Sequence, residues 1–243
     1  MNSKIVLIIG AKSDIAISTA EVFARSGYII KMAGRNINEF KALHPKLVHY
    51  HTQIEWIEFD ILQTEKFKSF ISSFSELPEI IISFVGYMGV KDESEKMKTS
   101  LEIMKTNYVC PSLLFKEFAN VFEVRGSGCL VGVSSVAGIR GRWSNYVYGS
   151  AKGGFTLFLS GLRARLYNKG IHVLTILPGF VNTQATKDMN LPKFLTAQPL
   201  DVANEIFKSV VLKKDVVYVY KIWKLIMLFI ILIPEKIFKR MKF

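Results

Sequence analysis

Residues 5–16 read IVLIIGAKSDIA, in which five consecutive aliphatic residues run into a glycine and then into a helix-like pattern. An unbroken apolar run of this length is typical of a strand that is buried on both faces of a parallel sheet. The segment therefore predicts a strand, a tight turn and a helix N-terminus in succession. Backbone N–H groups and the positive end of a helix dipole at such a turn favour the binding of phosphate groups.

The same alternation of short apolar runs and helical patterns continues along the chain. Strands are predicted over residues 5–9, 28–33, 56–59, 80–84, 128–134, 172–177 and 216–220. Helices are predicted over residues 14–26, 64–75, 94–124, 147–168 and 200–212. This order indicates an α/β fold, a Rossmann-type doubly wound parallel seven-stranded sheet in a single domain. Its ligand crevice is expected beyond the carboxyl ends of the strands, near the switch point.

The composition fits one folded domain. Half of the 243 residues are hydrophobic, which excludes disorder. We expect a catalytic domain over 1–221 and a separate apolar and basic tail over 222–243. The first apolar run is too short for a signal peptide, and Cys110 and Cys129 lie in apolar segments that suit a reducing compartment, so a cytoplasmic location is expected. His49 and His51 have no further His or Cys cluster to complete a metal set, so no metal is expected.

The net charge of +12 raises the question of a nucleic-acid partner. The lysines are scattered, and no basic run lies on a recognisable nucleic-acid-binding module, so no such partner is expected. A basic surface also suits an anionic cofactor, a phosphorylated substrate or an anionic membrane. Charge alone does not choose among these three.

The turn after the first strand is a candidate cofactor site. It contains only one glycine, and an acidic residue stands where dinucleotide folds usually have a second. The alternative is an ordinary strand-to-helix turn in which Asp14 is the N-cap. The candidate cofactor-binding residues of this turn are Gly10, Lys12, Ser13, Asp14 and Ile15.

Arg35, which follows the second strand, bears on the choice of cofactor. Enzymes that prefer the unphosphorylated nicotinamide cofactor usually have an acidic residue here to bind the ribose 2′-OH. A guanidinium suits a 2′-phosphate, with Lys12 as a possible neighbour, so NADP(H) is favoured over NAD(H). The alternative is a solvated loop arginine. Asp60, at the end of the third strand, either accepts from the adenine amino group or caps the next helix.

Ser135, Tyr148 and Lys152 form the candidate catalytic set. Tyr148 and Lys152 are four positions apart on a predicted helix and so share one face, and Ser135 ends a buried strand thirteen residues before Tyr148. Reduction of a carbonyl needs an acid for the developing alkoxide, and a nearby ammonium lowers the pKa of a tyrosine. Ser135 would hold the substrate oxygen, and Asn107 would hold a water that relays protons to Lys152.

A lone Tyr-x-x-x-Lys is usually a surface pair, but the combined motifs are specific. Tyr148-Gly149-Ser150-Ala151-Lys152 resembles the active-site motif of the short-chain dehydrogenases/reductases. Ser135 lies at that family's serine spacing, and Asn107 lies where its fourth catalytic residue is expected. Residues 178–183 resemble that family's Pro-Gly-x-Val-x-Thr segment. The resemblance covers about residues 4 to 220. It implies a nicotinamide-dependent oxidoreductase and a homo-oligomer. It also implies cofactor contacts from Gly86, Tyr148, Lys152, Pro178, Gly179, Val181 and Thr183. The chain departs from the family pattern at residues 83–86, which read SFVG in place of Asn-Asn-Ala-Gly.

A closer likeness within that family concerns the substrate. Residues 134–142, 144–148 and 160–166 resemble the decaprenylphosphoryl 2-keto-ribose reductases of cell-wall assembly. This resemblance implies reduction of a keto-sugar or lipid-linked carbonyl in cell-envelope glycan synthesis. Arg140 and Arg142 become candidate partners of a substrate phosphate, or else belong to a loop that packs against a neighbouring subunit. A general 3-ketoacyl or alcohol reductase and a non-catalytic cofactor-sensing regulator stay open as alternatives.

Two segments near the C-terminus have further expected roles. Residues 182–199 form a long connection beyond the sixth strand, which we interpret as a helical substrate lid. Residues 222–233 carry a single charge but are too short to span a bilayer, and basic residues follow Pro234. This pattern favours a helix lying in a membrane interface, at the inner face of the cytoplasmic membrane. The alternatives are a subunit interface or a cover over the substrate pocket.

Overall fold

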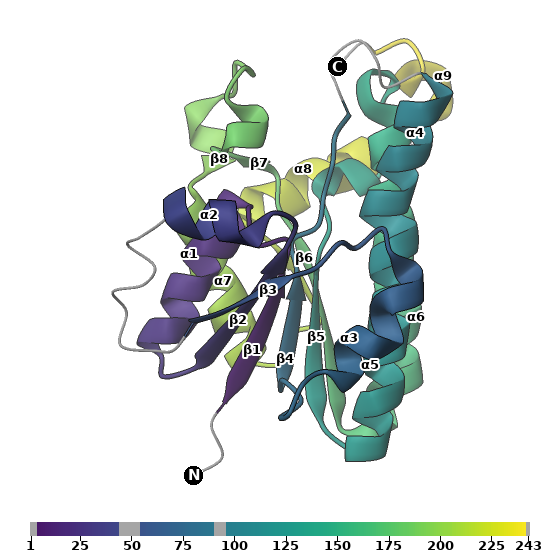
Figure 1. Ribbon diagram of the computed structural model, residues 1–243. Coiled ribbons are helices and arrows are strands. Elements are labelled where there is room, and N and C mark those ends of the chain that lie inside the picture. The colour runs from purple at the N-terminus through teal and green to yellow at the C-terminus, as the bar shows by residue number, and fades with distance from the viewer. Residues whose placement is uncertain (1–3, 44–53, 90–95, 242–243) are drawn as a thin grey trace.

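Seven parallel strands form the sheet of the computed structural model, which describes residues 4–43, 54–89 and 96–241 (Figure 1). The strands are β1 (Ile5–Ile9), β2 (Ile29–Gly34), β3 (Ile54–Glu58), β4 (Ile80–Ser83), β5 (Gly128–Val133), β6 (Ile171–Leu177) and β9 (Val216–Tyr218). Their order across the sheet is β3-β2-β1-β4-β5-β6-β9, and every pairing is parallel. The order reverses between β1 and β4, so the predicted doubly wound sheet and its switch point are confirmed.

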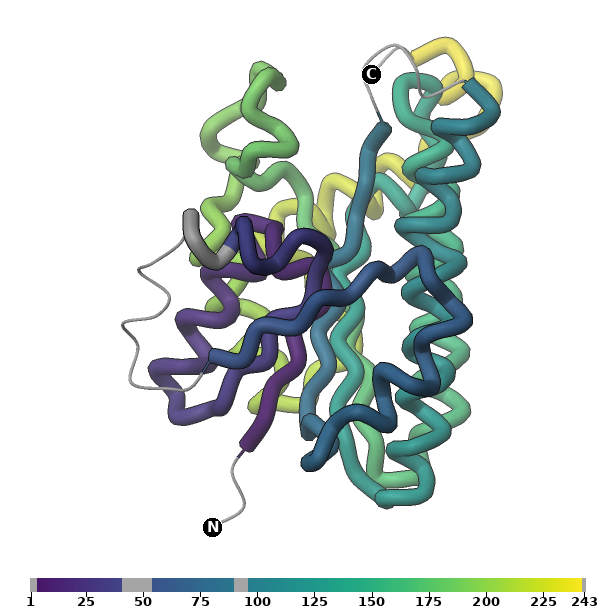
Figure 2. Tube along the Cα trace, in the orientation of Figure 1, coloured from purple at the N-terminus to yellow at the C-terminus, as the bar shows by residue number. Residues whose placement is uncertain are grey.

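Helices cover both faces of the sheet (Figures 1 and 2). They are α1 (Asp14–Arg25), α2 (Ile37–Leu43), α3 (Phe67–Ser72), α4 (Met97–Met104), α5 (Cys110–Arg125), α6 (Tyr146–Leu166), α7 (Pro199–Val211), α8 (Lys221–Leu232) and α9 (Glu235–Phe238). Helices α1 and α7 pack on one face, and α5 and α6 pack on the other. The carboxyl ends of the strands are therefore left open between the two helical layers.

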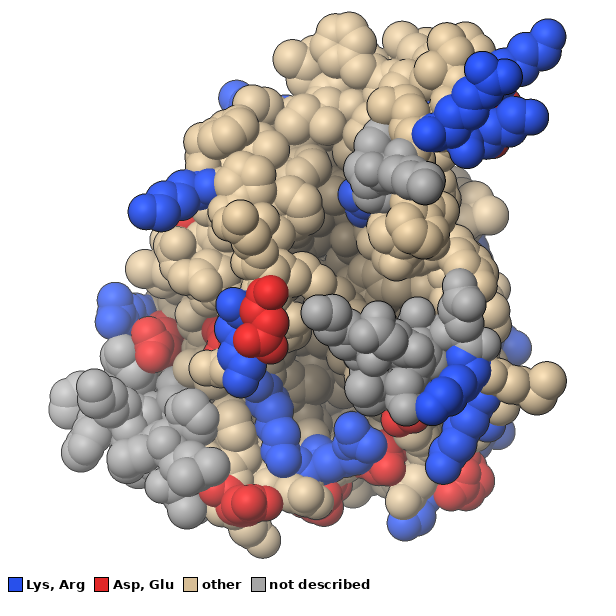
Figure 3. All heavy atoms as spheres, turned by 90° about the horizontal axis from the view of Figure 1, so that it is seen from above, with Lys and Arg blue, Asp and Glu red and all other residues tan. Residues whose placement is uncertain are grey.

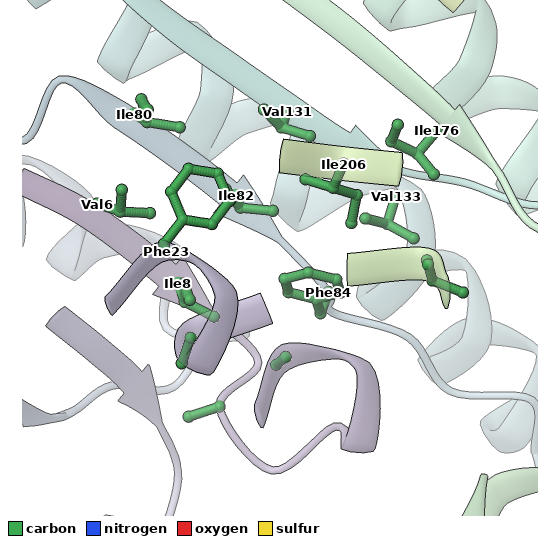
Figure 4. Close-up of a cluster of buried hydrophobic side chains, with 14 of the residues drawn as sticks. Val6, Ile8, Phe23, Ile80, Ile82, Phe84, Val131, Val133, Ile176 and Ile206 are labelled. Atoms are coloured by element: carbon green, nitrogen blue, oxygen red, sulfur yellow. The ribbon is translucent and has the colours of Figure 1, made fainter. Parts of the chain in front are cut away.

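The unbroken apolar runs are explained by these two layers. Val6 and Ile8 of β1 point to the layer that contains Phe23 of α1, and Leu7 and Ile9 point to the opposite layer. Figure 4 shows the first set, in which Val6, Ile8 and Phe23 lie with side chains of β4, β5, β6 and α7. Because both faces of β1 meet a helical layer, all five of its residues are apolar and buried.

Most element boundaries differ from the predicted ones by a few residues, but the predicted helix 94–124 differs in kind. It consists of α4, a π turn (Lys105–Val109) and α5. Pro111 has no N–H to donate to the carbonyl of Asn107 four residues earlier, which is where the regular ladder is interrupted. The predicted helix 64–75 is a 3₁₀ turn (Thr64–Lys66) followed by the short α3.

The C-terminal third contains two short strands that the sequence did not predict. The segment of the expected helical lid, 182–199, contains two 3₁₀ turns, and its β8 (Thr196–Ala197) pairs with β7 (Phe180–Val181). The tail, in which a helix was expected, forms α8 and α9. Within the described residues, no helix combines the length and apolar content needed to cross a bilayer. Those residues also contain no group of three or more side chains suited to a metal ion, and His49 and His51 lie outside them.

Candidate active site

Ser135 is the second residue beyond β5, and backbone hydrogen bonds of its neighbours fix its position. The N–H of Ser134 donates to the carbonyl of Ile176 at 2.8 Å, and the N–H of Val136 donates to the carbonyl of Pro178 at 3.0 Å. The Ser135 Oγ accepts the N–H of Ala137 at 3.1 Å, which starts a 3₁₀ turn over Val136–Gly138. The serine is thus held at the carboxyl edge of the sheet by its neighbours on both sides.

Glycines allow this 3₁₀ turn to touch α6. A Cβ on Gly138 would lie 2.5 Å from the backbone N of Gly153. A Cβ on Gly149 would lie 2.9 Å from the carbonyl oxygen of Ala137. The backbones meet directly, so only glycine fits at these positions without a shift of the main chain. This contact sets the separation of Ser135 from the helix that carries Tyr148.

Tyr148 meets Ser135 as the sequence predicts. The Ser135 hydroxyl lowers the pKa of Tyr148, but burial raises it more and the result is about 12. The phenol is therefore protonated throughout the neutral range. A partly buried, protonated phenol near a serine hydroxyl suits an acid that gives its proton to an oxygen placed between them.

Lys152 is almost fully buried one helical turn after Tyr148. Its Nζ donates to the carbonyls of Val133 at 3.1 Å and Val85 at 3.3 Å, and burial lowers its pKa from 10.5 to about 8. The sequence analysis expected Lys152 to lower the pKa of Tyr148. In the structure this effect is not found: the Nζ of Lys152 lies 6.0 Å from the centre of the Tyr148 ring, and burial dominates the pKa of the phenol.

The buried ammonium of Lys152 should make stability depend on pH. A lysine whose pKa falls on folding imposes its full cost below the folded pKa, here about 8, and the cost disappears as pH rises to the unfolded value of 10.5. The unfolding free energy of the natural chain should therefore rise between pH 8 and 10.5 relative to that of Lys152→Met, by about 3 kcal/mol at most. Urea unfolding of both proteins at each pH measures this difference, and parallel pH profiles would contradict it.

Asn107 lies in the π turn between α4 and α5 and is fully buried. Its Nδ2 donates to the carbonyls of Ile103 at 2.8 Å and Tyr87 at 2.6 Å, and its Oδ1 accepts the N–H of Tyr87 at 3.2 Å. A Cβ on Gly86 would lie 3.4 Å from that Oδ1 and 3.5 Å from the Lys152 Nζ. Asn107 is therefore close to Lys152, but its polar atoms hold the segment after β4 in place.

The expected cofactor turn lies at the carboxyl end of β1. The N–H of Gly10 donates to the carbonyl of Ala33 at 3.0 Å, which ties the turn to the end of β2. Gly10 has a φ of +88°, and a Cβ there would lie 3.0 Å from the backbone of Phe84, so the turn needs glycine on both counts. Ser13 is the N-cap of α1, its side chain makes no capping bond, and Ile15 packs against the core.

Asp14 is not the N-cap that one alternative expected. It is the first residue of α1, and its Oδ2 accepts the N–H of Gln184 at 2.8 Å. This bond joins the turn after β1 to the start of the lid segment. Dinucleotide folds usually have glycine at this position. The hydrogen bond to Gln184 explains why an aspartate stands here instead.

The ends of β1, β2 and β3 bring charged groups together. The carboxylate of Glu58 accepts the N–H groups of Asn36 and Ile37 at 2.8 and 2.9 Å, and these bonds, with a smaller effect of Lys12, lower its pKa. The negative charge of Glu58 is thus engaged by the backbone. The positive charge of this corner comes from the exposed Arg35 and from Lys12. These residues fit the 2′-phosphate end of a cofactor.

The other expected cofactor residues have structural contacts of their own. The Oδ1 of Asp60 accepts the N–H of Leu62 at 2.9 Å, so Asp60 stabilises the turn after β3. The carbonyl of Pro178 binds the segment after Ser135, Val181 pairs with Ala197, and Thr183 forms a capping box with Thr186.

Gly179 lies under the indole of Trp223, a residue that the sequence analysis did not single out. A Cβ on Gly179 would lie 1.9 Å from the ring, and the indole N–H donates to the carbonyl of Leu195 at 3.1 Å. Trp223 therefore joins α8, the Pro-Gly turn and the lid segment. A single tryptophan in an apolar tail carries no sequence signal that it packs on the Pro-Gly turn.

The structure corrects the assignment of Arg140 and leaves that of Arg142 open. The guanidinium of Arg140 donates to the carbonyls of Ile231 at 3.1 Å and Ile233 at 2.7 Å and to the carboxylate of Glu235 at 3.0 Å. These donors close the end of α8 and are not directed to a substrate phosphate. Arg142 is half-buried, which lowers its pKa.

Comparison with known proteins agrees with this arrangement. A family model described as short chain dehydrogenase matches residues 4–193. An uncharacterised oxidoreductase of Mycobacterium tuberculosis is 32% identical over 97% of this chain and 96% of its own length. The 3-oxoacyl-[acyl-carrier-protein] reductase of Homo sapiens is 26% identical over 84% of this chain and 89% of its own length. A short-chain dehydrogenase from Sphingobium yanoikuyae, solved in complex with NADPH, has a TM-score of 0.81 at 20% identity over 96% of this chain and 97% of its own.

Proposed function

This chain belongs to the short-chain dehydrogenase family of oxidoreductases, and from that premise we propose that it reduces a carbonyl to an alcohol with NADPH as hydride donor. The observation that carries the proposal is the protonated phenol of Tyr148 with the Ser135 hydroxyl acting on it and Lys152 one helical turn away. A regulator that only senses a cofactor has no need of a protonated phenol beside a serine at the crevice. The presence of Lys152 one turn away favours catalysis further.

Each residue of the set has a separate task in this reaction. Ser135 donates a hydrogen bond to the substrate oxygen and keeps it beside Tyr148. NADPH, when bound, would supply a hydride for the carbonyl carbon. Tyr148 would give the proton of its phenol to the carbonyl oxygen, which completes the alcohol. Lys152 places its Nζ one helical turn from Tyr148, held by the carbonyls of Val85 and Val133. Asn107 fixes the position of Lys152 through the segment that contains Val85.

The choice of NADP(H) rests on the corner formed by Lys12 and Arg35. The carboxylate of Glu58, which lies at this corner, is already engaged by two backbone N–H groups and is not directed to a ribose 2′-OH. The structural likeness to an NADPH complex supports the same choice. The turn at Gly10 would hold the diphosphate, and the segment from Pro178 to Thr183 would lie at the nicotinamide end.

Replacing Arg35 by alanine should weaken NADPH binding by about 1–3 kcal/mol, because a charged hydrogen-bonded contact is lost. NADH binding should hardly change, since NADH has no 2′-phosphate. Fluorescence titration of both cofactors with the natural chain and the variant measures the two losses. Equal losses for NADPH and NADH would show that Arg35 does not read the 2′-phosphate.

For the substrate we propose a keto-sugar or another lipid-linked carbonyl of cell-envelope glycan synthesis. The support is the resemblance of residues 134–142 and 144–148 to keto-ribose reductases. Arg142, half-buried in that stretch, is the candidate for an anionic group of the substrate. A 3-ketoacyl substrate is the second candidate, favoured by the likeness to the human 3-oxoacyl reductase. The expected homo-oligomer stays a prediction.

Consumption of NADPH, followed by its absorbance, tests the activity against a panel of keto-sugars, 3-ketoacyl thioesters and simple ketones. We expect turnover with at least one class and a marked preference for NADPH over NADH. The same assay with Tyr148→Phe shows whether the turnover arises at this site. Normal binding of NADPH without turnover of any carbonyl would favour the regulator instead.

A further inference from the structure

Helix α8 has two different faces. Trp223 and Met227 are buried, and Ile226 and Ile230 pack partly against the same cluster, so one stripe of the helix belongs to the core of the domain. This spacing of three and four residues is that of one helical face. The cluster also contains Val136 and Leu177, which lie beside the catalytic serine and the Pro-Gly turn.

The opposite face of α8 is apolar and exposed. We call this face the α8 patch. Its side chains are between 43% and 68% exposed, although all are large and hydrophobic: Ile222, Leu225, Leu228, Phe229, Ile231 and Leu232. A run of adjacent exposed apolar side chains on one helix marks a surface that is covered in use.

Basic residues accompany the α8 patch. Lys221 and Lys224 lie exposed in the first turn of α8, and Lys236, Lys239 and Arg240 are exposed in and after α9. Helix α8 contains no acidic residue. Figure 3, which looks onto the carboxyl ends of the strands, shows Lys and Arg side chains gathered at one corner of this face, next to a broad area of other residues.

These charges distinguish between two possible covers for the patch. In a twofold interface with a second copy, the patch would meet itself, and Lys221 and Lys224 would face like charges. The carboxylate of Glu235, the acidic group of residues 221–241, is bonded to Arg140 of its own chain. An anionic lipid surface offers both the apolar layer and the negative charge that this face lacks.

We propose that the α8 patch and its flanking lysines dock this protein on an anionic lipid bilayer, with α8 lying in the plane of the interface. This docking goes beyond the proposed reductase activity and does not depend on it. Arg140 closes the C-terminal end of α8 through Ile231, Ile233 and Glu235, so the helix is held rigidly for such a contact. Because Trp223 of the same helix covers Gly179, the docked face lies next to the proposed crevice.

Co-sedimentation with vesicles tests the proposal on the full chain. We expect binding to phosphatidylcholine vesicles that contain about a third phosphatidylglycerol, and binding weaker by roughly tenfold or more to pure phosphatidylcholine, because lysines near an anionic surface add strongly to affinity. The double variant Leu228→Glu/Phe229→Glu should lose binding by at least about tenfold. Reversal of charge in Lys221→Glu/Lys224→Glu should remove the preference for the anionic lipid.

The matched control is Val124→Glu/Leu212→Glu. These side chains are 91% and 57% exposed and precede β5 and β9, at the other end of the sheet. It should bind vesicles as the natural chain does, and thermal unfolding confirms that each variant is folded. The proposal is overturned if the natural chain does not bind the anionic vesicles, or if the α8 variant binds them as well as the natural chain does. The same holds if sedimentation velocity shows that the α8 variant only dissociates an oligomer.

Discussion

Tyr148→Phe should lower kcat by about 10²–10⁴-fold, the usual contribution of a positioned general acid. The substitution removes one oxygen and leaves the ring in place, so NADPH should bind with unchanged affinity. Burial raises the pKa of this partly exposed phenol to about 12, which means that it is protonated at every pH of a normal assay. Phenylalanine at this position cannot supply the proton that the developing alkoxide needs.

Steady-state rates and NADPH titrations of the natural chain and of Tyr148→Phe measure this effect. Tyr146→Phe is the matched control, because Tyr146 begins the same helix and is half exposed. The control should keep its turnover. Near-normal turnover in Tyr148→Phe would show that another group protonates the product and would remove the basis of the proposed mechanism.

The sequence predicts the sheet well because the sheet depends on local patterns. Apolar runs such as 5–9 are strands wherever helices cover both faces. The spacing from Tyr148 to Lys152 likewise predicts that both lie on one helix, and both are in α6. The family resemblance adds Ser135, whose hydroxyl acts on the Tyr148 phenol, and the catalytic role of the set stays a prediction.

The contacts that the sequence did not predict join segments far apart in the chain. Asp14 binds the backbone of Gln184, Arg140 closes a helix about ninety residues later, and Trp223 lies on Gly179. No spacing rule relates such pairs, because the fold alone brings them together. A helix was expected in the tail, but the face of α8 that packs inside could not be predicted, for a related reason. Its sequence is apolar nearly all round, and only its packing shows which face is inside.

The pKa of Tyr148 shows the same limit for electrostatics. Residue types alone suggest that a lysine one helical turn away lowers the pKa of the phenol. That holds where the two groups are close together and exposed to solvent. In the structure Lys152 is engaged by the carbonyls of Val85 and Val133, and burial decides the pKa of both groups. Burial is a property of the packed fold and could not be predicted from spacing.

Gly138→Ala should reduce kcat by about 100-fold, because even a displacement of about 1 Å at a catalytic group has effects of that size. The new Cβ would lie 2.5 Å from the backbone N of Gly153 and 2.7 Å from the backbone C of Lys152. Neither atom can turn away as a side chain does, so the 3₁₀ turn after Ser135 must move off α6. Ser135 and Tyr148 then separate. Stability should also fall, by about 1–3 kcal/mol for overpacking.

Gly141→Ala makes the same substitution three residues later, at a position where a Cβ would meet nothing within 4 Å. Its kcat and stability should stay close to those of the natural chain. NADPH affinity should be nearly unchanged in both variants, because the expected diphosphate turn at Gly10 is built on β1 and β2 and not on this contact. A loss of kcat with intact NADPH binding in Gly138→Ala alone shows that the close approach of this turn to α6 positions the reacting groups. Equal rates in the two variants would show that the turn adjusts without moving Ser135, and the geometry of the site would then have to be set elsewhere.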